Sequence, residues 1–133
     1  MRIVISGDGD IAQQLVRALH RRHDVVVIED DADEAERFDR LDLQLLRGNA
    51  TNPETLREAG VDRADAFIAC GVSDEANIIA AMTAKRMGAA QTTCFVSSQA
   101  YVQSFAGISE SDGTMVIDRI VWPQYMLAEE IAR

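Results

Sequence analysis

Short apolar runs rich in β-branched residues alternate with amphipathic stretches along the chain, and this alternation limits the possible folds more than any other feature. Strands that are separated by helices pair in parallel through crossover connections rather than as hairpins. Parallel strands are covered on both faces, which explains why each run is largely apolar. The six predicted strands span residues 3–6, 25–29, 43–46, 66–70, 93–97 and 115–117.

Four of the amphipathic stretches are predicted as connecting helices. The first has an apolar stripe at helical spacing that begins at Ile11, and it ends near Arg22. The second is a charged helix over residues 31–40. The third begins with Asn52 as N-cap and a proline at the first helical position. The fourth is capped by Ser73 or Asp74 and stopped by Gly88.

The last residues of the sequence, 119–133, are predicted as a terminal interface helix that starts near Pro123. Its residues are apolar nearly all round. A helix of this kind needs cover from its own domain and from something else, either a partner subunit or a continuation of the chain.

Length and charge restrict the class of protein. A chain of 133 residues has the size of one domain, so residues 1–133 are expected to form a single unit. Lys and Arg number 13 and Asp and Glu 22, and the net charge of −9 argues against binding to nucleic acid or to an anionic membrane surface. The longest uncharged stretch, 87–109, is broken by Gln, Thr and Ser, so no direct membrane insertion is expected. The first residues read as a strand and lack the apolar segment and cleavage site of a signal peptide, which predicts a cytosolic protein.

The first predicted strand is followed by Gly7-Asp8-Gly9-Asp10-Ile11-Ala12, which fits the G-x-G-x-x-G/A pattern of dinucleotide-binding folds. The first glycine permits a tight turn, the second lets the backbone approach a pyrophosphate, and the small residue at the end lets the helix pack closely on the strand. The start of the helix then offers free N–H groups to an anion. The motif follows a predicted strand and opens a predicted helix, which is the order that dinucleotide binding requires.

Glu29 ends the second predicted strand, twenty residues after Gly9. An acidic side chain at this place accepts hydrogen bonds from an adenosine ribose and disfavours a 2′-phosphate. NADP is therefore the least expected ligand, whereas NAD, ATP, ADP and AMP remain open. The alternative is that the glycines only make a turn and that Glu29 is solvated, and the combined order of features favours a nucleotide site over it.

Asp8 and Asp10 place two carboxylates beside the predicted phosphate site, where they would repel the ligand. One interpretation is that both face solvent and complement the helix dipole, and it suits Asp8 better than Asp10. Another is that magnesium bridges these carboxylates and the phosphates.

The sequence gives little evidence of catalytic residues. Cys70 and Cys94 each lie in an apolar run, which predicts buried thiols in a reducing compartment rather than a disulfide. His20 and His23 have no neighbouring residues at metal-ligand spacing, so no metal site of their own is expected. No serine stands in a recognisable His and Asp arrangement, and neither a general base nor a catalytic domain is evident. We therefore predict that the chain is not an enzyme.

At this point the sequence strongly resembles the N-terminal domain of the TrkA and RCK family, nucleotide-sensing regulators of potassium transporters and channels. The resemblance covers nearly the whole chain. It is carried by residues 7–12, 28–31, 47–51, 56–65, 73–77 and 117–131. The resemblance implies a doubly wound α/β sheet of the Rossmann type, with strand order 3-2-1-4-5-6.

The resemblance also implies a site and partners. The ligand's pyrophosphate would lie over residues 7–11 and its ribose against Glu29. The base would lie near Asp30, Asn49 and Ala50, with Cys70 and Gly71 on the far side. The final helix would form a homodimer, and such dimers assemble into rings on a membrane channel. The protein would thus be cytoplasmic, held at the inner face of the cell membrane through its partner.

The chain departs from the family at three of the site positions. Asp10 stands where ATP-binding members often carry a basic residue, Asn49 replaces the commoner Asp, and Ser97 stands where an arginine is frequent. The family's second, C-terminal ligand domain is not among these 133 residues.

The function predicted from all of this is a nucleotide-responsive regulatory domain of a potassium uptake system. Two alternatives remain open. One is the cofactor domain of an NAD-dependent oxidoreductase whose catalytic part lies outside this sequence. The other is an assembly module whose pocket binds nothing.

Overall fold

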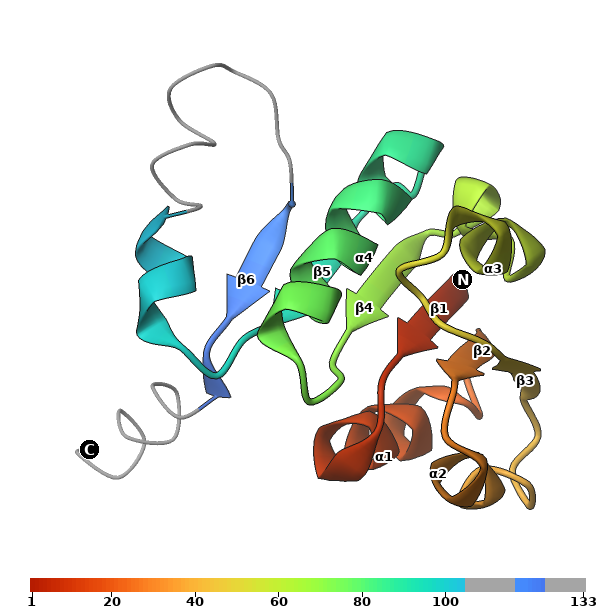
Figure 1. Cartoon of the computed structure of the whole chain (residues 1–133). Coiled ribbons are helices and arrows are strands. Elements are labelled where there is room, and N and C mark those ends of the chain that lie inside the picture. The colour runs from red at the N-terminus through yellow and green to blue at the C-terminus, as the bar shows by residue number, and fades with distance from the viewer. Residues whose placement is uncertain (105–116, 124–133) are drawn as a thin grey trace.

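The computed structural model describes residues 1–104 and 117–123. Within them, parallel strands form a six-stranded sheet in the order β3-β2-β1-β4-β5-β6 (Figure 1). This confirms the predicted doubly wound sheet and its strand order. The strands are β1 (Arg2–Ser6), β2 (Asp24–Glu29), β3 (Gln44–Arg47), β4 (Ala66–Ala69), β5 (Thr92–Phe95) and β6 (Arg119–Val121).

The central strands are buried on both faces, and successive residues belong to two separate cores. Val4 and Val26 pack with the residues of one core, whereas Ile5 and Val27 pack with the other, and all four are fully buried. Successive side chains of a strand point to opposite faces of the sheet. A strand between two helical layers therefore has to be apolar at every position, as the sequence indicated.

The helices cover the two faces in pairs, with α1 and α2 on one face and α3 and α4 on the other (Figure 1). Their bounds are α1 (Gly9–Leu19), α2 (Ala32–Glu36), α3 (Pro53–Glu58) and α4 (Asp74–Met87), with the short 3-10 helix η1 (Val61–Arg63) after α3. The predicted caps are confirmed. Asn52 accepts a hydrogen bond from the N–H of Glu54, Ser73 accepts one from Ala76, and Gly88 ends α4 with φ +117°.

The second helix is shorter than predicted, because it ends at Glu36 rather than at residue 40. The N–H groups of Arg37 and Phe38 bond to carbonyls three residues back, so the chain tightens into turns here. Phe38 is fully buried in the core below α2. The charged sequence of the segment masked this need to bury one aromatic side chain.

The predicted sixth strand at 115–117 was wrong. The strand is β6, at Arg119–Val121, and it pairs in parallel with β5. Ile117 is buried but lies before the strand, and residues 115–116 lie outside the described residues. A helix over residues 99–104, which we did not predict, lies between β5 and β6.

The predicted terminal helix at 119–133 was wrong at its start, because residues 119–121 are a strand. Pro123 is helical, as predicted for the start of that helix, and residues 124–133 lie outside the described residues. The dimerisation helix therefore stays a prediction.

Candidate functional site

The carboxyl ends of β1, β2 and β4 meet at one edge of the sheet. The strand order reverses on either side of β1, since β1 pairs with β2 on one side and with β4 on the other. Such a reversal leaves a crevice outside the strand ends, where open α/β sheets bind ligands. The loops that follow these strands carry most of the predicted site residues.

The loop after β1 contacts the loop after β4 at Gly7. A Cβ atom on Gly7 would lie 2.5 Å from the carbonyl carbon of Cys70 and 2.5 Å from the nitrogen of Gly71, and φ of Gly7 is +145°. Only glycine fits between these backbones. At Gly9, where φ is +84°, a Cβ atom would meet nothing within 4 Å. The first glycine therefore lets the loops pack, and the second opens the start of α1 to an approaching group.

A cavity of about 180 Å³ lies beside this loop contact, on the β2 and β3 side. Seven predicted site residues line it: Gly7, Asp8, Glu29, Asp30, Asn49, Ala50 and Gly71. Other lining residues were not predicted, and they come mainly from the ends of β1 and β2, the loop after β3 and the first half of α4: Ser6, Ile28, Gly48, Thr51, Val72, Ser73, Ala76, Asn77 and Ala80.

A second hollow of about 340 Å³ lies on the β5 side of the same loops. It contains the four remaining predicted residues, Gly9, Asp10, Ile11 and Cys70. Asp8, Gly71 and Val72 line both hollows, so the two adjoin at the tips of the loops. The structure thus distributes the predicted residues over both sides of the glycine loop.

Asn77 is the clearest residue that the sequence reasoning missed. Its side chain is buried on α4, where Oδ1 accepts a hydrogen bond from the N–H of Gly71 at 2.9 Å. Its Nδ2 donates to the carbonyls of Gly71, at 2.9 Å, and of Phe95, at 3.0 Å. The amide therefore fixes the loop after β4 to the end of β5. An asparagine on the apolar face of a helix is the signal that could have revealed it.

Glu29 is buried at the floor of the first cavity, with 5% of its surface exposed. Oε1 accepts a hydrogen bond from the N–H of Asp31 at 3.0 Å, whereas Oε2 is buried without a partner among the described residues. Burial raises the pKa of the Glu29 carboxyl, the Asp31 N–H opposes this shift, and the charge of Asp8 adds to it. A buried acceptor without a donor fits a ligand that brings a hydroxyl group.

The exposure of Asp8 and Asp10 is the reverse of the prediction, which favoured a solvent-facing side chain at Asp8 rather than at Asp10. The side chain of Asp10 is 90% exposed, and its Oδ1 lies 3.6 Å from Nη2 of Arg37. Asp8 is half-buried and lines both hollows. Asp8 thus lines the first cavity and Asp10 does not, because Asp8 precedes the helix while Asp10 lies on the exposed side of its first turn.

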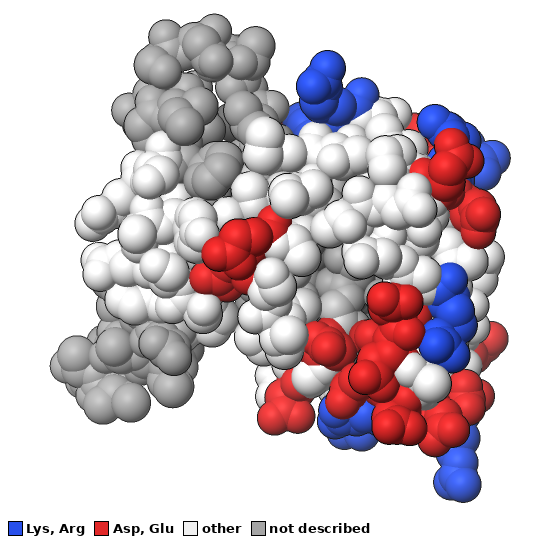
Figure 2. Space-filling model, viewed as in Figure 1, with Lys and Arg blue, Asp and Glu red and all other residues white. Residues whose placement is uncertain are grey.

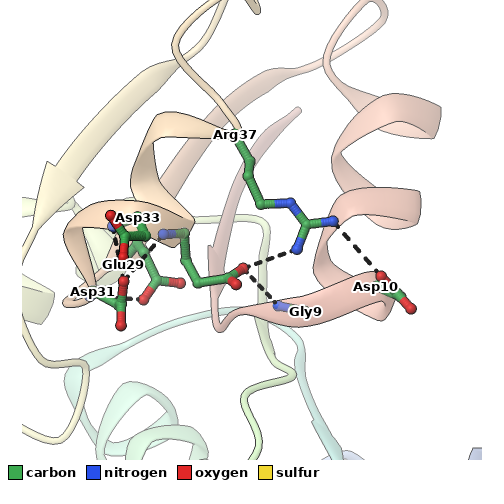
Figure 3. A network of polar contacts seen from close by, with 7 residues as sticks. Gly9, Asp10, Glu29, Asp31, Asp33 and Arg37 are labelled. Carbon is green, nitrogen blue, oxygen red and sulfur yellow. Dashed lines mark hydrogen bonds and ion pairs between the residues drawn. The ribbon is translucent and has the colours of Figure 1, made fainter.

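Glu34 and Arg37 form a polar network with the start of α1 (Figure 3). Oε2 of Glu34 accepts a hydrogen bond from the backbone N–H of Gly9 at 3.2 Å and from Nη1 of Arg37 at 3.0 Å. Asp31 caps α2, which carries Glu34 and ends just before Arg37, by accepting from the N–H groups of Asp33 and Glu34. Neither Glu34 nor Arg37 was a predicted site residue.

Acidic side chains gather over α2 and the loop before it (Figure 2). The acidic residues of this segment are Asp30, Asp31, Asp33, Glu34 and Glu36. Their charge raises the electrostatic cost of bringing a phosphate to the site, and the cost is greater for more highly charged ligands.

Both cysteines are free and buried, as predicted. Burial raises the pKa of each thiol to about 12, with a smaller contribution from Asp8 at Cys70 and from Asp74 at Cys94. A thiol with so high a pKa is almost wholly protonated at neutral pH and is a poor nucleophile. Cys70 therefore contributes shape to the second hollow rather than reactivity.

In residues 1–104 and 117–123, no group of three or more His, Cys, Asp and Glu side chains is arranged to hold a metal ion. None of the helices in that part of the chain is long and apolar enough to span a bilayer.

Residues 3–121 match the family model of the TrkA-N domain. The chain belongs to the TrkA-N domain family. Over its full length it is 38% identical to a Trk system potassium uptake protein TrkA homolog of Archaeoglobus fulgidus, and it covers 30% of that protein. This chain thus corresponds to less than a third of that relative's length.

Solved structures share the TrkA-N fold. The TrkA-N domain of the inner membrane protein YbaL from Escherichia coli superposes with a TM-score of 0.80 at 16% identity, covering 98% of this chain and 93% of that one. The GsuK channel bound to NAD superposes with a TM-score of 0.73 at 21% identity, covering 90% of this chain and 21% of the channel. At such identities the agreement concerns the fold alone.

Proposed function

We propose that this TrkA-N domain binds NAD(H) or an adenine nucleotide and thereby regulates a potassium transporter or channel. The observation that carries the proposal is the buried Oε2 of Glu29, which has no partner among the described residues and lies in a cavity beside a glycine loop. An unsatisfied buried acceptor destabilises the protein by about 1 to 3 kcal/mol, and a ribose hydroxyl would relieve this.

The residues around Glu29 give each part of an adenosine ligand a matching environment. The start of α1 suits phosphate, which backbone N–H groups and the helix dipole stabilise. Asp30, Asn49 and Ala50 line the cavity beside Glu29 and would surround the base. A 2′-phosphate would bring like charge to the Glu29 carboxylate, so NADPH is expected to bind poorly.

The second hollow favours a ligand that extends beyond one nucleotide. It adjoins the first at Asp8 and Gly71, and Ile11 and Phe95 give it apolar walls. Dinucleotides cross the glycine loop of this fold, with one nucleotide on each side. The GsuK channel, a protein of the same fold, has been solved bound to NAD and bound to ADP. The proposal therefore includes both dinucleotides and mononucleotides. Magnesium would accompany the phosphates.

Regulation would act through a population shift. A ligand that binds one arrangement of the subunits more tightly than another favours that arrangement by the difference in its binding free energies. The segment after Pro123 is proposed as the interface of a homodimer or of a larger ring. The ring would sit at the cytoplasmic face of the membrane through its transporter or channel, and the domain itself would catalyse no reaction.

The potassium system is proposed from the curated relatives, since the Archaeoglobus protein is a Trk system potassium uptake protein homolog. Calorimetry of the chain against NADH, NADPH, ATP, ADP and AMP tests the nucleotide part. Binding of at least one ligand without a 2′-phosphate, with NADPH at least tenfold weaker than NADH, is expected. If none of the five binds, the chain is an assembly module, and the proposed function is wrong.

A further inference from the structure

The start of α1 already holds an anionic group, and that group belongs to the chain itself. The N–H of Gly9, the first residue of this eleven-residue helix, donates to Oε2 of Glu34 at 3.2 Å. Backbone N–H groups at this place in the fold are those that hold a ligand's phosphate. The carboxylate of Glu34 therefore occupies a donor that the proposed ligand needs.

Two neighbouring contacts hold Glu34 in this position. Asp31 accepts a hydrogen bond from its backbone N–H at 3.1 Å and so fixes the first turn of α2. Arg37, one helical turn later, binds the same carboxylate oxygen at 3.0 Å. In Figure 3 the guanidinium of Arg37 lies between this carboxylate and Asp10. The side chain of Glu34 is itself only 29% exposed.

We propose that Glu34 is an internal competitor for phosphate at the glycine loop and sets the preference of the site for ligands with few phosphate charges. The inference rests on the proposed nucleotide site and adds a residue that determines its specificity. One N–H makes one good hydrogen bond, so phosphate and carboxylate exclude each other at Gly9. A displaced carboxylate stays near the phosphate, and their repulsion grows with each added phosphate charge.

The test is calorimetry of the chain with adenosine, AMP, ADP and ATP at one fixed ionic strength. The variant Glu34→Gln keeps an oxygen that can accept from Gly9 but removes the charge. Its matched control is Glu36→Gln, because Glu36 is an exposed carboxylate on the same helix and lines neither hollow.

For Glu34→Gln we expect ATP to bind about tenfold more tightly than to the wild type, which corresponds to about 1.4 kcal/mol. The gain should fall from ATP to ADP to AMP, and adenosine should stay within about twofold because it has no phosphate. Glu36→Gln should change every affinity by less than about threefold, since its charge is exposed and screened by salt.

The inference is overturned if Glu34→Gln does not tighten ATP, or if adenosine gains as much as ATP. It is also overturned if Glu36→Gln gains as much as Glu34→Gln, because the effect would then be one of net charge. In these cases measurable nucleotide binding would still support the proposed function. Failure of the wild type and both variants to bind any of the four ligands would overturn both proposals.

Discussion

Gly7 and Gly9 are two residues apart in one loop, yet an added methyl group has different consequences at each. Gly7→Ala forces a Cβ atom to 2.5 Å from the backbone of Cys70, which cannot move without breaking the loop contact. We expect a loss of about 3 kcal/mol or more in the free energy of unfolding. The Cβ atom of Gly9→Ala would lie in open space. Its only cost is the backbone strain of a positive φ, which should lower the free energy of unfolding by about 1 kcal/mol.

Urea unfolding of the two alanine variants measures this difference. Equal losses of stability would contradict the close approach of the loops at Gly7. Gly9→Ala should remain folded and bind nucleotide less well than the wild type, because its methyl group lies where the ligand approaches the helix start.

Glu29 should make the stability of the fold depend on pH. Burial raises its pKa in the folded state above its ordinary value of 4.5, so the folded state binds the proton more tightly than the unfolded state. The stability that this gives is present below pH 4.5 and is lost as the pH rises through the raised pKa. We therefore expect the wild type to lose stability relative to Glu29→Gln as the pH is raised through this range.

Urea unfolding of the wild type and Glu29→Gln at matched pH values measures the difference, in which the titration of the other carboxylates largely cancels. A difference that stays constant with pH would mean that Glu29 is not desolvated.

At the residue scale, the sequence predicted those site residues that belong to a local sequence pattern. The glycine motif and Glu29 follow from their order along the chain, and the cavity brings Gly7 and Glu29 together. The partners of Asn77 and Glu34, which are Gly71 and Gly9, could not be found in this way, because they are set by how a helix packs rather than by spacing.

At the scale of elements, β6 is held by a polar anchor rather than by apolar packing alone. The carboxylate of Asp118 accepts hydrogen bonds from the N–H and hydroxyl of Thr92 and from Nζ of Lys85, the last at 2.8 Å. Burial alone would raise the pKa of Asp118, but these donors hold it below its ordinary value. The anchor joins the chain just before β6 to β5 and α4.

We expect Asp118→Asn to lower the free energy of unfolding by about 1 to 3 kcal/mol, because Lys85 loses its half-buried partner. Asp42→Asn is the control, since Asp42 is exposed, and it should stay within about 0.5 kcal/mol of the wild type. Thermal or urea unfolding at neutral pH compares them. Equal stability of the two variants would mean that the anchor contributes nothing.

The two elements that were placed wrongly share a physical cause. At β6 the apolar run around Ile117 suggested the strand, but the half-buried Asp118 fixes the chain there and pairing begins at Arg119. At α2 a charged run suggested a long helix, but the buried Phe38 ends it early. In both cases one side chain with a distant partner overrode the local pattern.

At the scale of the whole molecule, the alternation of strands and helices was sufficient to predict a parallel sheet, because strands with helical connections have few other ways to pair. The resemblance to the family supplied the strand order. The proposed assembly could not be checked in this way, since it involves the segment after Pro123 and partner chains. The proposed regulation therefore rests on the proposed nucleotide site, whose lining residues are described.

The central claim is that Glu29 holds the ribose of a nucleotide, and titration of the wild type and Glu29→Gln with NADH and NADPH tests it most directly. Glu58→Gln is the control, because Glu58 is exposed on α3 and lines neither hollow. We expect the wild type and the control to bind NADH at least tenfold more tightly than NADPH, and Glu29→Gln to lose most of that preference. Equal binding of NADH and NADPH by the wild type, or an unchanged preference in Glu29→Gln, would contradict the assignment of Glu29.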